Sequence, residues 1–483
     1  MTQTSPPRGF GAPKALLLTA ALLCGAAFAA RAQRLLAQAG PPSAVQNPAP
    51  PADGSVPLPA ERGDSEDAAD DEHAVENAVA GEAPPPPSAE AAEKPAQVEA
   101  VPAAAANKVA EQKHLEGLKL WKKAKLTGTG DALGYFAEAP GGKQVRMSVE
   151  PALQKQMQKL LHTYQPMQGA MVAIDPKTGK VLALVEYARD GNAEGLATRP
   201  LYPAASVFKI ITGAALLEAG VSPDAETCYH GGLRGIVGKL LEDKPHVDRR
   251  CLSLSMALAK SANVVFAKMA VKHLDGQSLR NLAERFLFNR PIWNVPVEQS
   301  IANIPDGKLE LAKSAAGFGQ VKLSPLHAAL IAAAVGNGGT AYEPSLVEEI
   351  DGEPAAPGGT SRVLKPETAA ALRDMMKYTV TEGTATASFR ERGRSVLGNI
   401  EVAGKTGSMS NHRRPYMDYS WFVGFAPADD PKIAVAAVVV NGLIWRIHAP
   451  YVAREAFRAY LVGGSLGQPP VARVHRRHHR RHL

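Results

Sequence analysis

A serine and a lysine three residues apart, Ser206 and Lys209, form the first group in this sequence that could perform covalent chemistry. On a helix, residues three apart share a face, so the lysine amine can lie beside the serine hydroxyl. A serine hydroxyl is a weak nucleophile until a base takes its proton, and a desolvated lysine can serve as that base. Taken alone the pair is weak evidence, because a serine N-cap followed by an exposed lysine is the commoner arrangement.

A second polar group, Ser261 and Asn263, lies between two apolar helical stretches. Two such side chains in a loop between helices can project into one cleft. The hydroxyl of Ser261 could relay a proton, and the amide of Asn263 could hold a peptide group through its donor and acceptor together. By itself this segment would be an ordinary polar turn.

A third group, Lys405, Thr406, Gly407 and Ser408, follows a strand-like run. Alternation along a strand would place Lys405 and Thr406 on opposite faces. A lysine and a hydroxyl suit a carboxylate ligand, and a glycine at position 407 would let a substrate backbone approach closely. On its own the group could also be a strand end with a solvated lysine.

The elements that must position these groups follow from hydrophobic patterning. Two hairpins are predicted, one from residues 171–174 and 181–185 and one from residues 421–426 and 432–440, and the last arm is apolar enough for a strand covered on both faces. Helical stretches are predicted at residues 206–219, with Gly220 as the C′ residue, and at 254–273, 325–335 and 451–461. Strands at both ends with helices between them favour a mixed α/β fold, an antiparallel-type sheet layered with helices.

The three groups occur in the order S-x-x-K, S-x-N and K-T-G, with 55 residues from Ser206 to Ser261 and 144 from Ser261 to Lys405. In this order they resemble the penicillin-binding transpeptidase family, which is related to the serine β-lactamases. The resemblance extends to residues 202–206, 317–328, 383–384 and 421–427, and covers about residues 145–461. It implies a β-lactamase/transpeptidase-like fold.

The resemblance also implies a role for each residue. Ser206 would attack the penultimate D-alanine carbonyl of a D-Ala-D-Ala stem, with Lys209 as its base. Ser261 would carry a proton to the leaving amine, and Asn263 would orient the acyl chain. Positive potential would come from Lys405, and the terminal carboxylate would be bound by Thr406 and Ser408 beside Gly407. Backbone N–H groups of Ser206 and Ser408 would form the oxyanion hole.

The function expected from this resemblance is a peptidoglycan D,D-transpeptidase that β-lactam antibiotics inhibit through a serine acyl-enzyme. Its partners would be peptidoglycan stem peptides and β-lactams, and no metal or organic cofactor is implied. The motifs do not separate a transpeptidase from a D,D-carboxypeptidase, since these differ only in whether an amine or water resolves the ester. A serine β-lactamase, a β-lactam sensor and a non-catalytic wall-binding scaffold are further alternatives.

The N-terminal third has a different composition. Residues 1–32 contain an apolar run from 15 to 30 that we expect to be a signal peptide or a membrane anchor. Residues 33–107 are rich in Ala, Pro and Glu, and we expect a disordered tether there. A lead-in segment at 108–144 and a transpeptidase domain at 145–467 would follow. Most of the region before the domain has the composition of a linker and not of a folded glycosyltransferase domain. We therefore expect a separate glycosyltransferase to polymerise the glycan strands.

The formal net charge of +7 conceals a segregation of charge. Residues 51–100 carry 13 acidic and two basic side chains, whereas residues 468–483 form a basic tail with five arginines and four histidines. No groove-reading motif accompanies the basic tail, so we expect no nucleic-acid partner and favour a solvated tail near anionic lipid or wall polymer. Metal capture by His475, His478, His479 and His482 has no fixed geometry to support it.

Export would place the catalytic domain on the periplasmic side of the inner membrane. Once Cys24 of the targeting segment is set aside, Cys228 and Cys251 are the remaining pair. An oxidising compartment permits a disulfide between them, which would stabilise the fold by roughly 3 kcal/mol. Two unpaired thiols are the equally weighted alternative, because the sequence does not show their separation.

Overall fold

The computed structural model describes residues 117–463, except 294 and 412–413. The expected targeting segment, the expected linker, the first part of the lead-in and the basic tail therefore lie outside the described residues. Within the described ranges, no helix combines the length and the apolar character needed to cross a bilayer.

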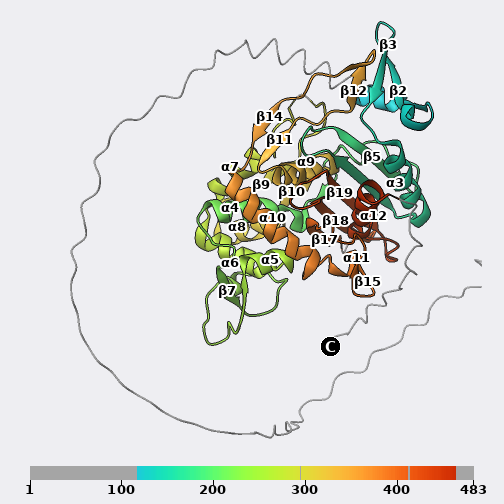
Figure 1. Cartoon of the computed structure of the whole chain (residues 1–483). Helices are drawn as coiled ribbons and strands as arrows, with labels where there is room; N and C mark the ends of the chain where they lie inside the picture. The colour runs from blue at the N-terminus through green and yellow to red at the C-terminus, as the bar shows by residue number, and fades with distance from the viewer. Residues whose placement is uncertain (1–116, 294, 412–413, 464–483) are drawn as a thin grey trace, which may run out of the picture. The chain divides into compact units, whose positions relative to one another are not determined.

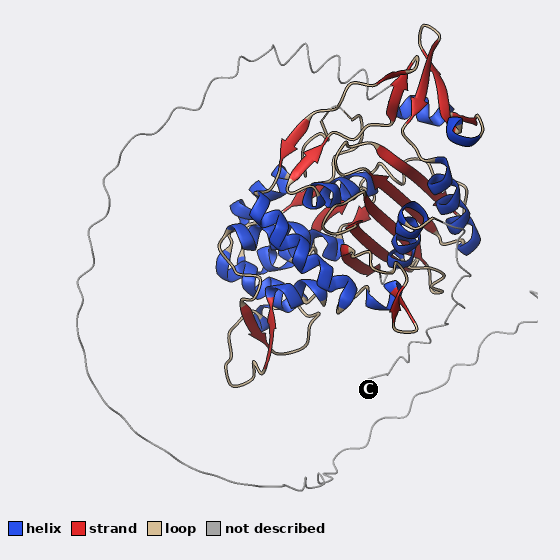
Figure 2. Ribbon diagram, in the orientation of Figure 1, coloured by secondary structure: helices blue, strands red, loops and turns tan. Residues whose placement is uncertain are grey.

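An antiparallel sheet of five strands lies at the centre, in the order β17-β18-β19-β4-β5 (Figure 2). The strands are β4 (Gln168–Ile174), β5 (Val181–Ala188), β17 (Ala403–Asn411), β18 (Met417–Ala426) and β19 (Ile433–Asn441). The pairs β4–β5 and β18–β19 are the two hairpins that the sequence predicts. The α/β class with an antiparallel sheet layered with helices is confirmed.

Strand β19 is buried on both faces, as its continuous apolar run predicts. Its odd-numbered residues, such as Val435 and Val439, pack with helices α3 (Pro151–Tyr164) and α12 (Ala449–Leu461). Its even-numbered residues, such as Ala436 and Val438, pack on the side of helix α9 (Pro325–Gly336). The sheet is therefore the middle layer between two sets of helices (Figure 1).

The helices between the two hairpins form the second half of the domain. Besides α9, they are η2 (Ala205–Phe208), α4 (Lys209–Glu218), η3 (Gly238–Leu240), α5 (Leu254–Ala259), α6 (Asn263–His273), α7 (Gly276–Arg285), α8 (Lys308–Ala315), α10 (Pro366–Thr381) and α11 (Thr386–Phe389). The stretch predicted as helical at 254–273 is thus two helices. The interruption occurs because Ser261 adopts a left-handed backbone with φ of 54°, which no helix interior accommodates.

The lead-in contributes strands to a second five-stranded sheet, which has the order β1-β2-β3-β12-β13. Its strands are β1 (Lys125–Thr127), β2 (Gly134–Ala139), β3 (Lys143–Met147), β12 (Val347–Ile350) and β13 (Glu353–Pro354), and η1 (Gly130–Ala132) precedes β2. The boundary expected at Val145 passes through β3, which pairs with β12 some 200 residues later. Residues 125–147 are therefore joined to the domain by backbone pairing.

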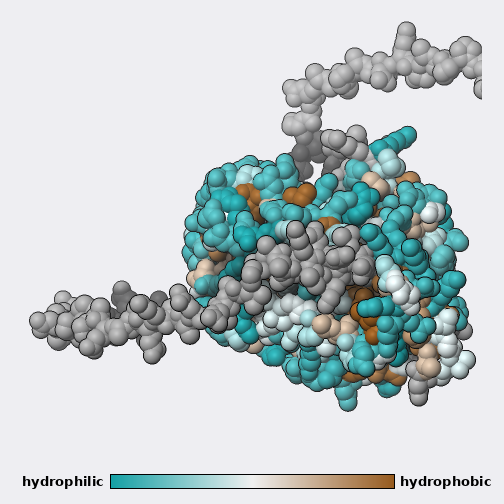
Figure 3. Space-filling view, turned by 90° about the horizontal axis from the view of Figure 1, so that it is seen from above, coloured by the Kyte–Doolittle hydropathy of each residue, from teal (hydrophilic) through white to brown (hydrophobic). Residues whose placement is uncertain are grey.

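Shorter strand pairs complete the domain. They are β6 (Tyr202–Pro203), β9 (Ile301–Asn303) and β10 (Gln320–Leu323) in one sheet, and the pairs β7 (Glu226–Tyr229) with β8 (Arg250–Ser253), β11 (Thr340–Tyr342) with β14 (Thr360–Arg362), and β15 (Arg390–Glu391) with β16 (Arg394–Ser395). The face drawn in Figure 3 is mostly hydrophilic, with hydrophobic residues in small patches. Among the described residues, Leu443 and Ile444, between β19 and α12, are the most exposed large aliphatic side chains.

Candidate active site

Ser206 lies in a tight turn that leads from strand β6 into helix α4. The turn begins at Ala205, whose left-handed φ of 48° is uncommon for a residue with a Cβ, and continues as the short 3-10 helix η2. The helix predicted at 206–219 therefore starts as a 3-10 turn and becomes an α-helix at Lys209. At its far end Gly220 has φ of +84°, as the predicted C′ position requires. The strained turn presents Ser206 at the start of the helix.

Lys209 is completely buried and has three oxygen neighbours. Its Nζ lies 2.8 Å from Ser206 Oγ, 2.7 Å from Asn263 Oδ1 and 2.8 Å from the carbonyl oxygen of Ala316. An ammonium donates to all three. A neutral amine has two N–H groups and one lone pair, and the amide and carbonyl oxygens can only accept. They would take both N–H groups, so the lone pair is left for the hydroxyl of Ser206.

The charge state of Lys209 is set by its surroundings. Burial lowers the pKa of Lys209 well below its usual value, and the nearby Lys405 lowers the pKa further. The neutral amine is the form that can accept a proton from Ser206. The packing around Lys209 therefore favours the state needed for a general base.

Ser261 and Asn263 occupy the break between helices α5 and α6. The left-handed backbone at Ser261 turns the chain sharply, and Asn263 becomes the first residue of α6. Asn263 Nδ2 donates to the carbonyl of Arg234 at 3.1 Å, and its Oδ1 faces Lys209. Two motifs that the sequence separates are thereby joined through one amide.

Lys405 lies on strand β17 and is completely buried. Its Nζ donates to Ser261 Oγ at 3.0 Å and to the carbonyl of Thr406 at 2.8 Å. Burial lowers the pKa of Lys405 to about 7. The hydroxyl of Thr406, on the next residue, shares a hydrogen bond with Thr384, in the turn between helices α10 and α11. This strand thus joins the third motif to the second.

Gly407 packs closely against neighbouring protein segments. A Cβ there would lie 3.1 Å from Trp421 Cβ, 3.2 Å from Val207 Cγ2 and 3.4 Å from the carbonyl oxygen of Ala204. The space that the missing side chain leaves is therefore filled by β18 and by the turn that carries Ser206, so that the close approach is between protein segments. Ser408, the next residue, is exposed.

Residues of all three sequence-predicted motifs thus gather where η2, the α5–α6 break and β17 meet. The carbonyl of Ala316 could not be found from residue types, because every residue carries one. Gly317, in the 317–328 segment noted above, is a better signal: its φ is +88°, and a Cβ would lie 1.8 Å from the carbonyl oxygen of Ala205. Only glycine lets this segment pack against the turn that carries Ala205 and Ser206.

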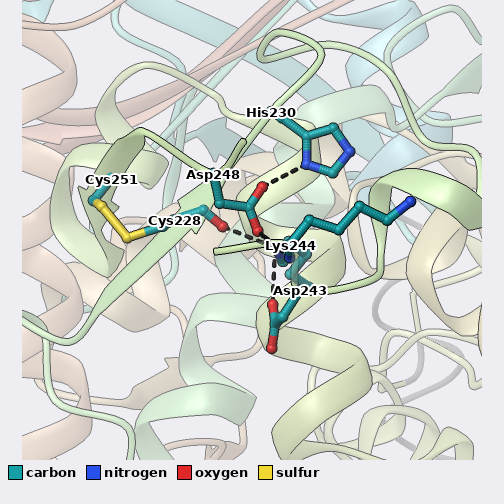
Figure 4. Close-up of a disulfide and its surroundings, with 7 residues drawn as sticks. Cys228, His230, Asp243, Lys244, Asp248 and Cys251 are labelled. Atoms are coloured by element: carbon teal, nitrogen blue, oxygen red, sulfur yellow. Dashed lines mark hydrogen bonds and ion pairs between the residues drawn. A yellow bond between two sulfur atoms is a disulfide. The ribbon is translucent and has the colours of Figure 1, made fainter. Parts of the chain in front are cut away.

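Cys228 and Cys251 form a disulfide that joins directly opposed positions of the β7–β8 hairpin. Charged side chains, among them Asp248, lie to one side of the disulfide, as Figure 4 shows. In residues 117–463, apart from the undescribed positions, no group of three or more His, Cys, Asp or Glu side chains is placed to hold a metal ion. The four histidines of the basic tail lie outside the described residues.

Comparison with known families identifies a match over more than half of the chain. A family model described as the penicillin binding protein transpeptidase domain matches residues 169–460. The peptidoglycan D,D-transpeptidase PbpA of Mycobacterium tuberculosis is 29% identical over 377 residues, which cover 69% of this chain and 72% of that protein. MrdA of Haemophilus influenzae, also a peptidoglycan D,D-transpeptidase, is 24% identical and covers 72% of this chain and 61% of that protein.

Solved structures agree with the sequence comparison. Penicillin-binding protein A from M. tuberculosis has a TM-score of 0.54 at 26% identity, with 66% of this chain and 80% of that chain covered. Its imipenem acyl-enzyme complex has a TM-score of 0.55 at 27% identity, with 66% and 79% covered. The D,D-transpeptidase domain of a peptidoglycan glycosyltransferase from Eggerthella lenta has a TM-score of 0.55 at 25% identity, with 69% and 89% covered.

Proposed function

This chain belongs to the penicillin-binding protein transpeptidase domain family, and from that membership we propose that it is a serine D,D-transpeptidase that cross-links peptidoglycan stem peptides. The observation that carries the proposal is the amine of Lys209, which lies within hydrogen-bond distance of both Ser206 and Asn263. A nucleophile, a base and an orienting amide are what acyl transfer from a peptide requires. The relatives named above carry this activity in their names, and one was solved as an imipenem acyl-enzyme.

In the proposed reaction Lys209 takes the proton of Ser206, whose Oγ attacks the penultimate D-alanine carbonyl. The backbone N–H groups of Ser206 and Ser408 would stabilise the oxyanion, a contribution of about 3–4 kcal/mol for each donor. Ser261 would deliver a proton to the nitrogen of the departing D-alanine. This role of Ser261 is supported by the hydrogen bond that Lys405 Nζ donates to Ser261 Oγ. An amine of a second stem then attacks the ester and releases Ser206.

Substrate orientation is assigned to the remaining residues. The ammonium of Lys405 would supply positive potential for the terminal carboxylate, with the hydroxyls of Thr406 and Ser408 as hydrogen-bond donors. The exposure of Ser408 leaves its hydroxyl accessible to a ligand. A β-lactam carries a carboxylate beside its reactive amide, so the same groups would hold the drug while Ser206 opens the ring.

We also propose that the catalytic domain works on the periplasmic side of the inner membrane. The apolar run at residues 15–30 supports export, and the disulfide between Cys228 and Cys251 suits an oxidising compartment. A separate glycosyltransferase would supply glycan strands, because residues 33–107 have the composition of a linker. Detection of the labelled protein in the inner-membrane fraction, with Cys228 and Cys251 inaccessible to thiol reagents, would test this placement.

The first test is covalent labelling with a fluorescent penicillin. We expect stoichiometric labelling of the protein and a loss of at least about 10³-fold in the acylation rate for Ser206→Ala. Ser222→Ala is the matched control, since that serine is exposed and lies beyond the end of α4. Equal labelling of the Ser206→Ala variant, with its unfolding transition intact, would refute the assignment.

The second test separates the related reactions. The protein is incubated with a stem peptide that ends in D-Ala-D-Ala, together with an acceptor amine. Cross-linked product identifies a transpeptidase, whereas release of D-alanine without cross-links identifies a carboxypeptidase. Rapid turnover of nitrocefin would instead identify a β-lactamase, because the acyl-enzyme would then be hydrolysed quickly.

A further inference from the structure

The loop between strands β7 and β8, residues 230–249, is closed at its base by the disulfide between Cys228 and Cys251. The hairpin and its loop extend from the helical half of the domain and lie beside helix α6 (Figure 1). Helix α6 begins at Asn263, so the loop lies against the helix that carries an active-site residue. The mechanism described above gives this loop no role.

A buried ion pair fastens the loop to α6. Lys268, with a side chain only 4% exposed, donates from Nζ to the carbonyl of Cys228 and to the carboxylates of Asp243 and Asp248, each at 2.9 Å. Asp248 is 5% exposed and also has His230 Nδ1 at 2.5 Å, the pair seen side by side in Figure 4.

The protonation state of this ion pair is well defined. Burial by itself raises the pKa of Asp248, but hydrogen bonds from the Lys244 N–H, His230 and Lys268 outweigh burial and hold the pKa below its ordinary value. For Lys268, burial lowers the pKa, and Asp243 and Asp248 together raise it above the usual value. Both partners are therefore charged at neutral pH, and the loop is held by an ion pair as well as by the disulfide.

The backbone of the same loop holds Asn263. The carbonyl of Leu233 accepts the N–H of Asn263 at 2.8 Å and the N–H of Val264 at 3.3 Å. The carbonyl of Arg234 accepts from Asn263 Nδ2 at 3.1 Å. A carbonyl can only accept, so the NH₂ end of the amide must face the loop and the oxygen must face Lys209. Rotation of the amide by 180° would place two donors against each other at Lys209.

We propose that loop 230–249, clamped by the Cys228–Cys251 disulfide and the Lys268–Asp248 ion pair, is a positioning element that fixes the amide of Asn263. The fixed amide oxygen takes one N–H of Lys209 and so directs the lone pair of the neutral amine at Ser206. Breaking either clamp lowers the rate of acylation. This inference rests on the proposed function, because it assigns the loop to the same acylation step.

The first experiment measures how fast a fluorescent penicillin acylates purified variants. Two quantities are determined separately: the affinity of the initial non-covalent complex and the rate constant of the acylation step that follows. Cys228→Ser/Cys251→Ser and Lys268→Met each break one clamp. We expect the acylation rate constant to fall about tenfold in each variant, with the affinity changed less than twofold. Lys244→Met is the matched control, since Lys244 Nζ pairs with the exposed Glu242 and contacts neither clamp through its side chain.

The second experiment asks whether the effect passes through Asn263. Each clamp variant is combined with Asn263→Ala, and the acylation rate constants are compared in a double-mutant cycle. If the loop acts by orienting the amide, breaking a clamp costs less than about twofold once the amide is gone. A purely structural role would leave the tenfold effect unchanged in the Asn263→Ala background, and that outcome overturns the inference.

A third measurement uses the unmodified protein. Incubation with dithiothreitol transfers two electrons and two protons to the disulfide, so that the reagent becomes a cyclic disulfide and the protein gains two thiols. Labelling should slow about tenfold and recover on reoxidation. The two clamps are broken by separate substitutions, so one variant that retains its unfolding transition suffices. Unchanged acylation in a folded clamp variant contradicts the inference, whereas an unmodified protein that penicillin does not label at Ser206 contradicts the proposed function instead.

Discussion

Lys209 and Lys405 must be in different protonation states if acylation is to proceed as proposed. Lys209 has to be neutral to accept the proton of Ser206, whereas Lys405 has to be charged to attract a carboxylate. Burial lowers the pKa of both lysines, and Lys405 further lowers the pKa of Lys209, because a second positive charge nearby is unfavourable. The protein thus favours the neutral form at Lys209 more strongly than at Lys405.

We therefore expect a bell-shaped dependence of benzylpenicillin acylation on pH. The second-order rate constant should rise with pH as Lys209 loses its proton, since only the neutral amine is a base. It should fall above about pH 7, as Lys405 loses its charge. Roughly tenfold lower activity is expected two pH units above the maximum. Stopped-flow measurement of labelling across the pH range checks both limbs.

The methyl ester of benzylpenicillin separates the two limbs. It has no carboxylate for Lys405 to attract, so its acylation should keep the acid limb and lack the alkaline limb. An alkaline limb of the same depth for both compounds would show that Lys405 does not act through the ligand's carboxylate.

At the scale of elements, the site is assembled where three backbone segments approach unusually closely. Ala205 and Ser261 both adopt left-handed conformations that cost of order 1–3 kcal/mol each. The cost is sustained because neighbouring segments hold the turns, and Gly317 is the clearest example. Because Gly317 has no Cβ, it can pack closely against the carbonyl of Ala205. The carbonyl of the preceding residue, Ala316, accepts a hydrogen bond from Lys209.

Gly317→Ala should consequently damage both stability and acylation. The left-handed φ alone costs about 1 kcal/mol of stability when the residue is an alanine. In addition, the new Cβ would overlap the carbonyl of Ala205 and force the segment away from the turn that carries Ser206. We expect the free energy of unfolding to fall by about 3 kcal/mol and the acylation rate to fall at least tenfold. Urea unfolding and penicillin labelling measure the two effects.

Gly319→Ala is the control for this prediction. Gly319 has a similar φ of +86°, but a Cβ there would meet only Ser314 Oγ, at 3.9 Å. It should lose only about 1 kcal/mol of stability and acylate at nearly the normal rate. Equal losses in the two variants would mean that backbone conformation, and not contact with the Ala205 turn, decides the outcome.

For the whole molecule, the described part of the lead-in belongs structurally to the catalytic domain. Strand β3 pairs with β12, and Val145, Met147 and Leu120 are buried in the main hydrophobic cluster. Each such side chain contributes about 1.5–3 kcal/mol when fully buried. Removing these residues would uncover the cluster and leave the edge of β12 unpaired.

Two truncated chains test this integration. A chain that begins at residue 117 keeps all the pairing of β1 to β3 and should label with penicillin at the rate of the full chain. A chain that begins at residue 148 should lose its cooperative thermal transition or unfold many degrees lower. Equal melting temperatures for the two would show that the first sheet adds nothing to the stability of the domain.

The order and residue types of the three motifs, both hairpins and the positions of helices α9 and α12 could be predicted from the sequence. These features depend on side-chain identity and on local periodicity, which a sequence displays directly. The nucleophile–base pair was predictable for the same reason, because three residues along a helix define a shared face. The covered strand β19 followed from an unbroken apolar run.

What only the tertiary structure decided is how distant backbone segments meet. The carbonyls of Ala316 and Arg234 hold Lys209 and Asn263, yet a carbonyl looks the same at every position of a sequence. The break at Ser261, the pairing of β3 with β12 and the packing of Gly407 against Val207 likewise depend on contacts between residues far apart in the chain. Side-chain types name the reacting groups, but backbone geometry set by long-range packing aims them at one another.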